Sequence, residues 1–240
     1  MNSTDFIIIL IITIASFKQG FSGFGFALIS MPLLSLIIDV REAAPIVALC
    51  GMVINIYLIY QLRAHIKFFE LRTLVIAAII GVPTGVYLLS HASSDLLKVI
   101  LGIIILAFVI LSFYKVFKPR NLNPKWGYFY GFMSGLMGGA FNTSGPPVII
   151  YFYLNGKEKV DMKAALTGYF TLNTIMIIIS HAVGGLTTMN TVKTALYCLP
   201  GVLAGIYFGH KLFNKIPQKI YNKVILIFLG ILSILLITGY

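Results

Sequence analysis

Two glycine- and proline-rich stretches, GFSGFGFALISMPLL at 20–34 and GLMGGAFNTSGPPVI at 135–149, interrupt apolar segments that would otherwise read as continuous helices. Aligned without gaps they match at four positions, Gly20 with Gly135, Gly23 with Gly138, Phe26 with Phe141 and Pro32 with Pro147. Two further pairs follow in the same order, GVPTGVYLLSH at 81–91 with GVLAGIYFGHK at 201–211, and KVIL at 98 and again at 223. The sequence therefore predicts an internal repeat, 1–120 and 121–240, within one membrane domain. The alternative is independent use of glycine and proline in membrane helices.

The composition is that of a membrane protein. Of 240 residues, 59% are hydrophobic and 10% are charged, whereas soluble domains hold about 25% charged residues. The mean hydropathy is +0.96. Nine stretches lack Asp, Glu, Lys and Arg, the first of them short: 6–17, 19–38, 43–62, 73–94, 99–114, 126–156, 164–192, 194–210 and 224–240. At about 20 residues per span, the chain has room for little besides transmembrane helices.

The net charge of +11 comes from basic loops rather than from a nucleic-acid surface. Lys and Arg concentrate in the link 115–125 and in 63–72, 157–163 and 211–223, and the counterparts of the last three in the other repeat (182–193, 39–42 and 95–98) hold few. Complementary charge patterns indicate inverted repeats. All four loops fall on one side of the membrane only if the two broken segments turn back. We therefore predict an all-α polytopic protein of two inverted repeats, each a re-entrant helical hairpin plus three transmembrane helices (7–8 hydrophobic segments). Both termini are expected outside and the basic loops in the cytoplasm.

The second broken stretch predicts a turn and then a half-helix from about Pro147 to Leu154. Glycine permits turns and close backbone approach, and proline suits the first turn of a helix. The N-terminus of such a helix attracts anions through its N–H groups and its dipole, and hydroxyl and amide side chains add donors. The candidate site residues here are Gly138, Gly139, Asn142, Thr143, Ser144, Gly145, Pro146 and Pro147.

The first stretch supplies the counterpart, with candidate residues Gly23, Gly25, Ser30 and Pro32. In inverted repeats the two turns would meet near the middle of the membrane, where two helix N-termini would face one site, as in many secondary transporters. The competing interpretation is that these residues only kink and pack helices.

Three polar residues within apolar segments are further candidates. A lysine at membrane depth suggests a functional site, so Lys18 would attract an anion, or else it would extend to a membrane surface. Asn55 and Asn173 lie near the centres of two spans, at roughly equivalent repeat positions. Each would donate to a solute or make a bond between helices.

The sequence holds no convincing catalytic set. The histidines lie at span ends or in loops, and the acidic residues lie outside the apolar runs. Cys50 and Cys198 are expected to be packing residues. We therefore expect no enzyme activity, no cofactor and no metal.

The paired stretches, above all Gly-Gly-x-x-x-x-x-Gly-Pro-Pro at 138–147, resemble the TauE/SafE family of sulfite exporters, and the resemblance covers nearly the whole chain. It implies a multi-pass inner-membrane transporter of small sulfur-containing anions such as sulfite, thiosulfate or sulfonates. We expect a secondary carrier that exports the anion by alternating access. An anion channel, the membrane subunit of a larger transport assembly and a membrane enzyme are the alternatives. The expected partners are the anion, the lipid bilayer and, in a homo-oligomer, further copies of the chain, with no nucleic acid.

Overall fold

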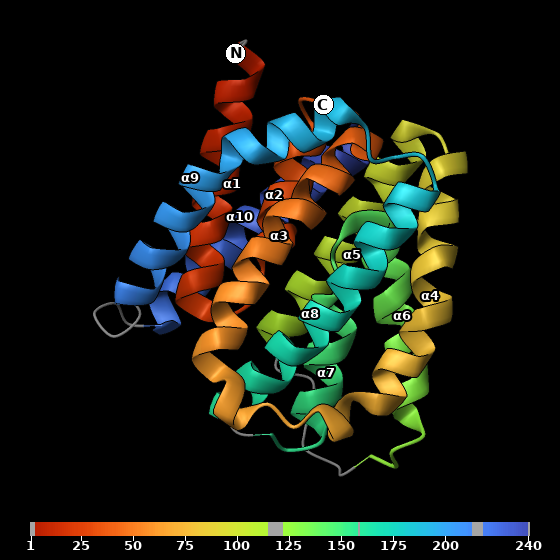
Figure 1. Cartoon of the computed structure of the whole chain (residues 1–240), viewed down its shortest axis with the longest axis vertical. Coiled ribbons are helices and arrows are strands. Elements are labelled where there is room, and N and C mark those ends of the chain that lie inside the picture. Colours follow the sequence, from red (N-terminus) through yellow and green to blue (C-terminus); the bar gives the residue numbers. More distant parts are fainter. Residues whose placement is uncertain (1–2, 115–121, 158, 213–217, 240) are drawn as a thin grey trace.

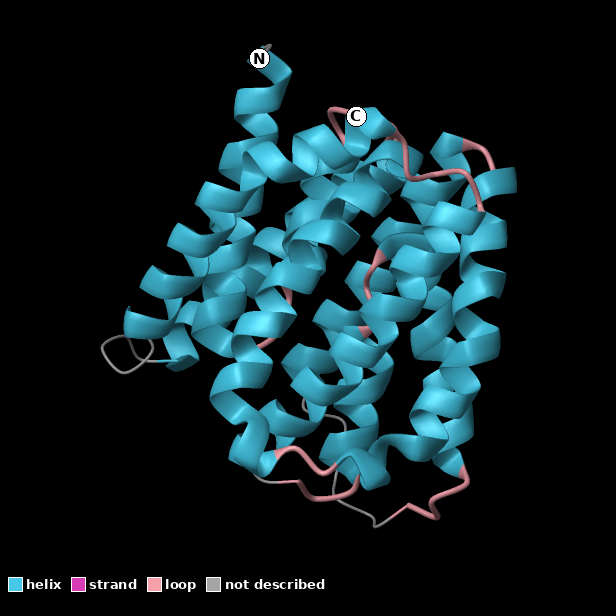
Figure 2. Ribbon diagram, viewed as in Figure 1, coloured by secondary structure: helices cyan, strands magenta, loops and turns pink. Residues whose placement is uncertain are grey.

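The computed structural model describes residues 3–114, 122–157, 159–212 and 218–239, and within these ranges regular structure is helical throughout (Figures 1 and 2). The predicted first repeat (1–120) contains α1 (Ser3–Ser22), α2 (Phe26–Ser35), α3 (Val40–Leu62), α4 (Arg72–His91) and α5 (Ser94–Tyr114), with short 3₁₀ turns at Arg63–His65 and Phe68–Leu71 between α3 and α4. The second contains α6 (Trp126–Phe141), α7 (Gly145–Leu154), α8 (Lys159–Val183), α9 (Met189–Leu212) and α10 (Gln218–Thr238). The predicted all-helical, polytopic fold is confirmed.

Among the described residues, the stretches long and apolar enough to cross a membrane are six: Thr4–Phe21, Val40–His65, Phe68–His91, Ser94–Ser112, Val160–Val183 and Met189–Leu212. The short helices α2 and α7 are apolar but would cover only about 15 Å at 1.5 Å per residue. In α10 the stretch Ile225–Thr238 is also apolar. The structure differs from the sequence prediction at α1, because this helix alone is long enough to cross the membrane. The first hairpin therefore consists of one long helix, α1, and one short helix, α2.

Both broken segments reverse direction. The chain turns after α1 and α2 packs against α1, and α7 packs against α6 in the same way. The first turn needs left-handed backbone at Gly23 (φ 80°) and Gly25 (φ 96°), which glycine adopts without a steric penalty. In the second turn Asn142 takes the left-handed conformation (φ 55°), and asparagine tolerates it better than most residues. The predicted hairpins therefore form at both places.

The helix boundaries correct the register of the repeat. The end of α1 and start of α2 align with the end of α6 and start of α7 when Gly23 corresponds to Asn142 and Gly25 to Ser144. The ungapped alignment, which pairs Gly23 with Gly138, therefore differs from the structural alignment by four residues, about one helical turn. The reason is that the ungapped alignment pairs identical residues, whereas the position of the chain reversal is set by the residue with left-handed backbone, Gly23 or Asn142. Pro32 lies inside α2, whereas Pro147 lies in the first turn of α7.

Each hairpin packs against a helix of the other repeat. The most extensive helix pairs are α4 with α6 and α1 with α9, while α5 packs on α10 and α3 on α8. Glycines allow the close approach: Gly139 on α6 lies against the Val82 backbone of α4, and Gly209 on α9 lies against the Phe17 backbone of α1. Small residues at such crossings are the usual basis of helix association in membranes. The repeats therefore interlock, and the boundary between 120 and 121 remains a prediction.

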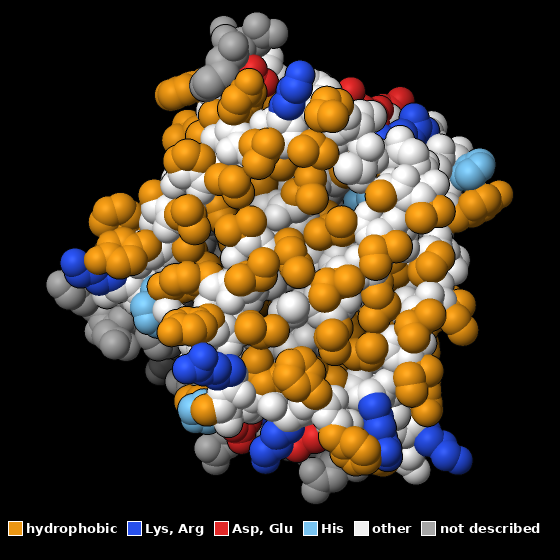
Figure 3. Space-filling model, viewed as in Figure 1, with side chains coloured by type: hydrophobic (Ala, Val, Ile, Leu, Met, Phe, Trp, Pro, Cys, Tyr) orange, Lys and Arg blue, Asp and Glu red, His pale blue; other side chains and the backbone are white. Residues whose placement is uncertain are grey.

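The start of α1 and the end of α10 lie at one end of the molecule, and the loops before α4, before α6 and before α8 lie at the other (Figure 1). Lys and Arg side chains gather near that second end on the face shown in Figure 3. Lys115, Lys118 and Arg120, which the sequence argument used, lie outside the described residues, as does Lys215. Which end faces the cytoplasm remains a prediction.

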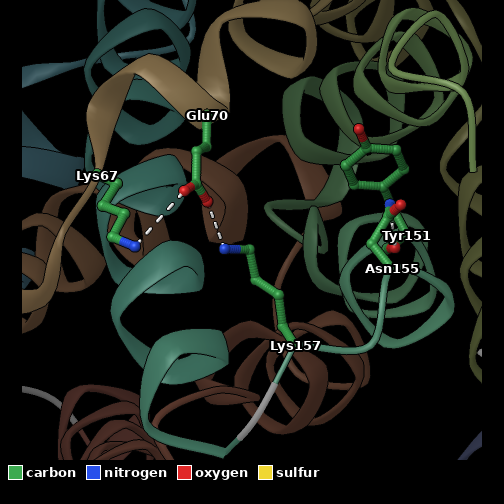
Figure 4. A network of polar contacts seen from close by, with 5 residues as sticks. All are labelled: Lys67, Glu70, Tyr151, Asn155 and Lys157. Carbon is green, nitrogen blue, oxygen red and sulfur yellow. Dashed lines mark hydrogen bonds and ion pairs between the residues drawn. The ribbon is translucent and has the colours of Figure 1, made fainter. Parts of the chain in front are cut away.

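An ionic cluster joins the two repeats at the basic end. The carboxylate of Glu70 accepts a hydrogen bond from the ammonium of Lys157 and lies 3.8 Å from Lys67 Nζ (Figure 4). Beside it, Asn155 closes the end of α7 by donating to the Tyr151 carbonyl (2.9 Å).

Candidate functional site

A cavity of about 60 Å³ lies between the two hairpin turns. Its walls come from both repeats: Gln19, Gly25, Phe26, Ala27, Leu28, Val47, Ala48, Gly51, Ile54, Asn55, Asn142, Thr143, Ser144, Gly145, Phe170 and Thr174. One water molecule needs about 10–15 Å³ of such space, so the cavity has room for roughly four to six waters. That is the size of an anion with four or five heavy atoms.

The first wall is the N-terminus of α2. Gln19 Oε1 accepts the backbone N–H of Phe26 (2.8 Å), which leaves the next two residues to face the cavity. The N–H groups of Ala27 and Leu28 belong to the first turn and have no acceptor within the helix. The positive end of the helix dipole adds to them, so this wall favours a negative charge.

The second wall is the turn before α7, which holds Asn142, Thr143 and Ser144, followed by Gly145. Pro146 and Pro147 occupy the first turn of α7, as the sequence predicted, but neither has an N–H group. Asn142 Nδ2 donates to the Ala44 carbonyl of α3 (2.8 Å). The second wall therefore offers the Gly145 N–H, the dipole and side-chain oxygens, and has fewer backbone donors than the first.

Asn55 on α3 and Thr174 on α8 face each other in the cavity wall. Asn55 Nδ2 donates to Thr174 Oγ1 (3.1 Å), which connects the two repeats at equivalent positions. Asn55 is among the site residues predicted from the sequence, whereas Thr174, Gln19 and Phe170 are not. Correct alignment of the repeats would have found Thr174, because it corresponds to Asn55 when Gly23 corresponds to Asn142.

Lys18 lies directly behind the first wall. Its Nζ donates to the Phe24 carbonyl (2.8 Å) and lies 4.0 Å from the centre of the Phe24 ring. A Cβ at Gly25, which lines the cavity, would come within 2.5 Å of that nitrogen. Only 5% of Lys18 is exposed, so its side chain does not extend to the molecular surface.

Asn173 does not line the cavity but supports the second turn from behind. Its Nδ2 donates to Ser144 Oγ (2.6 Å), and Ser134 Oγ donates to the Ser144 carbonyl (2.6 Å). His181 Nε2 lies 3.0 Å from the Gly139 carbonyl, and this histidine is fully buried although it lies near the end of its helix. The bonds from Asn173 and Ser134 fix the position of Ser144 at the cavity wall.

Several predicted site residues lie outside the cavity wall. Gly138 and Gly139 are within α6, where they pack closely against neighbouring groups instead of forming the turn. Ser30 Oγ donates to the Phe26 carbonyl within α2 (2.9 Å). The residues that the structure brings to the cavity are Gly25, Asn55, Asn142, Thr143, Ser144 and Gly145; those that it does not are Lys18, Gly23, Ser30, Pro32, Gly138, Gly139, Pro146, Pro147 and Asn173.

No cluster of histidine, cysteine, aspartate or glutamate that could hold a metal ion occurs among the described residues. Cys50 and Cys198 are free and buried. The cavity wall contains amide, hydroxyl and backbone N–H groups, which can bind and release a solute but supply no nucleophile paired with a base.

A multi-pass helical protein with two helical hairpins, whose turns meet at a small cavity that amide and hydroxyl groups help to line, has the architecture of a membrane transporter. The comparisons agree: residues 8–236 match the family model described as sulfite exporter TauE/SafE, and the chain belongs to this family. It is similar to a protein of Cupriavidus necator described as "Probable sulfite/organosulfonate exporter TauE", with 27% identity over 206 residues that cover 82% of this chain and 79% of the relative. No solved structure matches the chain.

Proposed function

We propose that this chain exports small sulfur-containing anions, such as sulfite, thiosulfate or sulfonates, across the cell membrane and binds them between the two hairpin turns. The observation that carries this proposal is the convergence of two helix N-termini, at Phe26 and Gly145, on one cavity of the size of such an anion. The family and the name of the relative support the same substrate class.

In this proposal each group has one task. The N–H groups of Ala27 and Leu28 donate to the anion oxygens, and Lys18 supplies positive charge through the thin wall at Gly25. Thr174 and Asn55 hold the opposite side of the anion. Asn142 holds the second turn against α3 through its bond to Ala44.

In the proposed alternating access, the two parts that move relative to each other are not the two sequence repeats. Because α1 packs most closely on α9 and α6 on α4, each hairpin would move together with its partner helix from the other repeat. Relative motion of these two units would open the cavity to one side and then to the other. The positive-inside rule would place the basic loops in the cytoplasm, with the protein in the inner membrane.

Thr174→Val tests the proposed binding site. Valine keeps the shape of threonine but removes the hydroxyl, and a hydrogen bond to a charged group contributes about 1.5–3 kcal/mol. We expect the KM for sulfite efflux from proteoliposomes to rise about tenfold or more. Thr171→Val is the matched control, because Thr171 lies on the same helix, bonds only the Thr167 carbonyl and lies outside the cavity wall. Equal effects of the two substitutions, or none at Thr174, would contradict the assignment.

A further inference from the structure

The first hairpin turn, Gly23–Gly25, is flanked by two lysines from different repeats. Lys18 of α1 bonds the Phe24 carbonyl inside the turn. Lys163 of α8 lies over the other side, where its aliphatic carbons would meet a Cβ at Gly23 at 2.9 Å. Because Gly23 and Gly25 are two residues apart, the Lys163 carbons that face Gly23 lie within about 10 Å of the cavity wall at Gly25, and Lys18 Nζ lies closer to it.

The second turn has no such pair. In the corrected register Lys18 corresponds to Met137, and Lys163 corresponds to Ala44, whose carbonyl accepts the Asn142 amide. The two walls of the cavity are therefore similar in backbone geometry and different in charge. Positive charge from the repeat-related positions is concentrated at the first turn.

Lys163 also lies toward the basic end of the molecule, one turn after the start of α8 at Lys159. It is half-buried, whereas Lys18 is buried. Moving from the basic end toward the middle of the molecule, one meets Lys163 first, then the Gly23–Gly25 turn with Lys18, and then the cavity.

We propose that Lys163 is a specificity-determining residue that, together with Lys18, makes the transporter prefer divalent over monovalent sulfur anions. This inference rests on the proposed function. Lys163 receives the anion from the basic end of the molecule, and Lys18 holds its charge at the cavity. The second turn, without lysines, binds the anion less tightly.

The charge of the transported anion sets the size of the effect expected when Lys163 is replaced. The interaction of Lys163 with an anion scales with the anion's charge, so the free-energy loss on removing the lysine is twice as large for a dianion as for a monoanion at the same place. A fourfold loss for methanesulfonate then predicts about a sixteenfold loss for thiosulfate. A structural defect at the turn would reduce transport of both anions by the same factor.

The test is efflux of thiosulfate and of methanesulfonate from proteoliposomes that contain the full chain, with Lys163→Met and Lys163→Arg. We expect Lys163→Met to raise the KM for thiosulfate about tenfold or more, with a clearly smaller change for methanesulfonate. Lys163→Arg is expected to stay within about threefold of the unchanged protein for both. The control is Lys193→Met, because Lys193 is exposed on α9 near the opposite end of the molecule.

Equal losses for the two anions, no loss, or no rescue by arginine would overturn this inference and leave the proposed function standing. If the unchanged, folded protein moves neither anion, the proposed function fails and the inference fails with it. Should Lys163→Met fold poorly, the thermal stabilisation of Lys163→Gln by each anion decides instead: a selective loss of stabilisation by thiosulfate supports the role of Lys163, and equal losses contradict it.

Discussion

Lys18→Met is expected to reduce the transport of sulfite and thiosulfate by about 100-fold or more while the protein remains folded. A unit charge about 5 Å from an anion contributes on the order of 3 kcal/mol at an effective dielectric constant of 20. Methionine suits this kind of position, because Met137 occupies the corresponding place beside the second turn. Flux in proteoliposomes measures the effect, and thermal unfolding of the purified protein checks the fold.

A second variant separates charge from structure. Lys18 Nζ also bonds the Phe24 carbonyl, and an unpaired buried carbonyl costs about 1–3 kcal/mol. Lys18→Gln keeps a donor near that carbonyl but removes the charge. If Lys18→Gln transports at the rate of the unchanged protein, the electrostatic role of Lys18 is wrong and its role is structural.

The second large effect concerns stability. Gly85→Ala is expected to lower the melting temperature by about 10 °C, because the new methyl group would overlap the Leu136 carbonyl of α6 and force α4 and α6 apart. Overpacking of this kind costs roughly 1–3 kcal/mol or more. Thermal unfolding in detergent measures the change.

Gly230→Ala is the matched control for Gly85→Ala. A Cβ at Gly230, in the middle of α10, would meet only Val109 at 3.8 Å, an ordinary contact. Alanine is also the better helix former by about 1 kcal/mol. This variant is therefore expected to keep or raise the melting temperature. Similar losses in both variants would show that glycine is needed for some reason other than the close contact of α4 with α6.

Sequence reasoning found the helical class, the two hairpins and most of the second turn, because glycine and proline within apolar runs mark breaks in a helix. It misplaced Gly138 and Gly139, which lie within α6 rather than in the turn. Glycine in a membrane helix serves either close packing or chain reversal, and the sequence alone does not separate the two uses. The actual reversal depends on the left-handed backbone of Asn142, which letter matching does not detect.

The cavity itself required the three-dimensional arrangement. Asn55 and Asn173 are similar in sequence context, but Asn55 faces the cavity while Asn173 bonds Ser144 behind it. The rotation of each helix decides this, and tertiary packing sets the rotation. The pairing of α1 with α9 and α6 with α4 also joins distant segments that no local pattern connects.

The most direct test of the central claim is radiolabelled thiosulfate efflux from proteoliposomes with the unchanged protein and with Gly51→Leu. Gly51 lines the cavity, and a Cβ there would have only an ordinary 3.7 Å contact with Phe26. We therefore expect the remaining atoms of a leucine side chain to extend into the cavity and fill it. We expect saturable efflux that sulfite inhibits in the unchanged protein, and none in folded Gly51→Leu. Efflux through Gly51→Leu at the rate of the unchanged protein would contradict passage of the anion through this cavity.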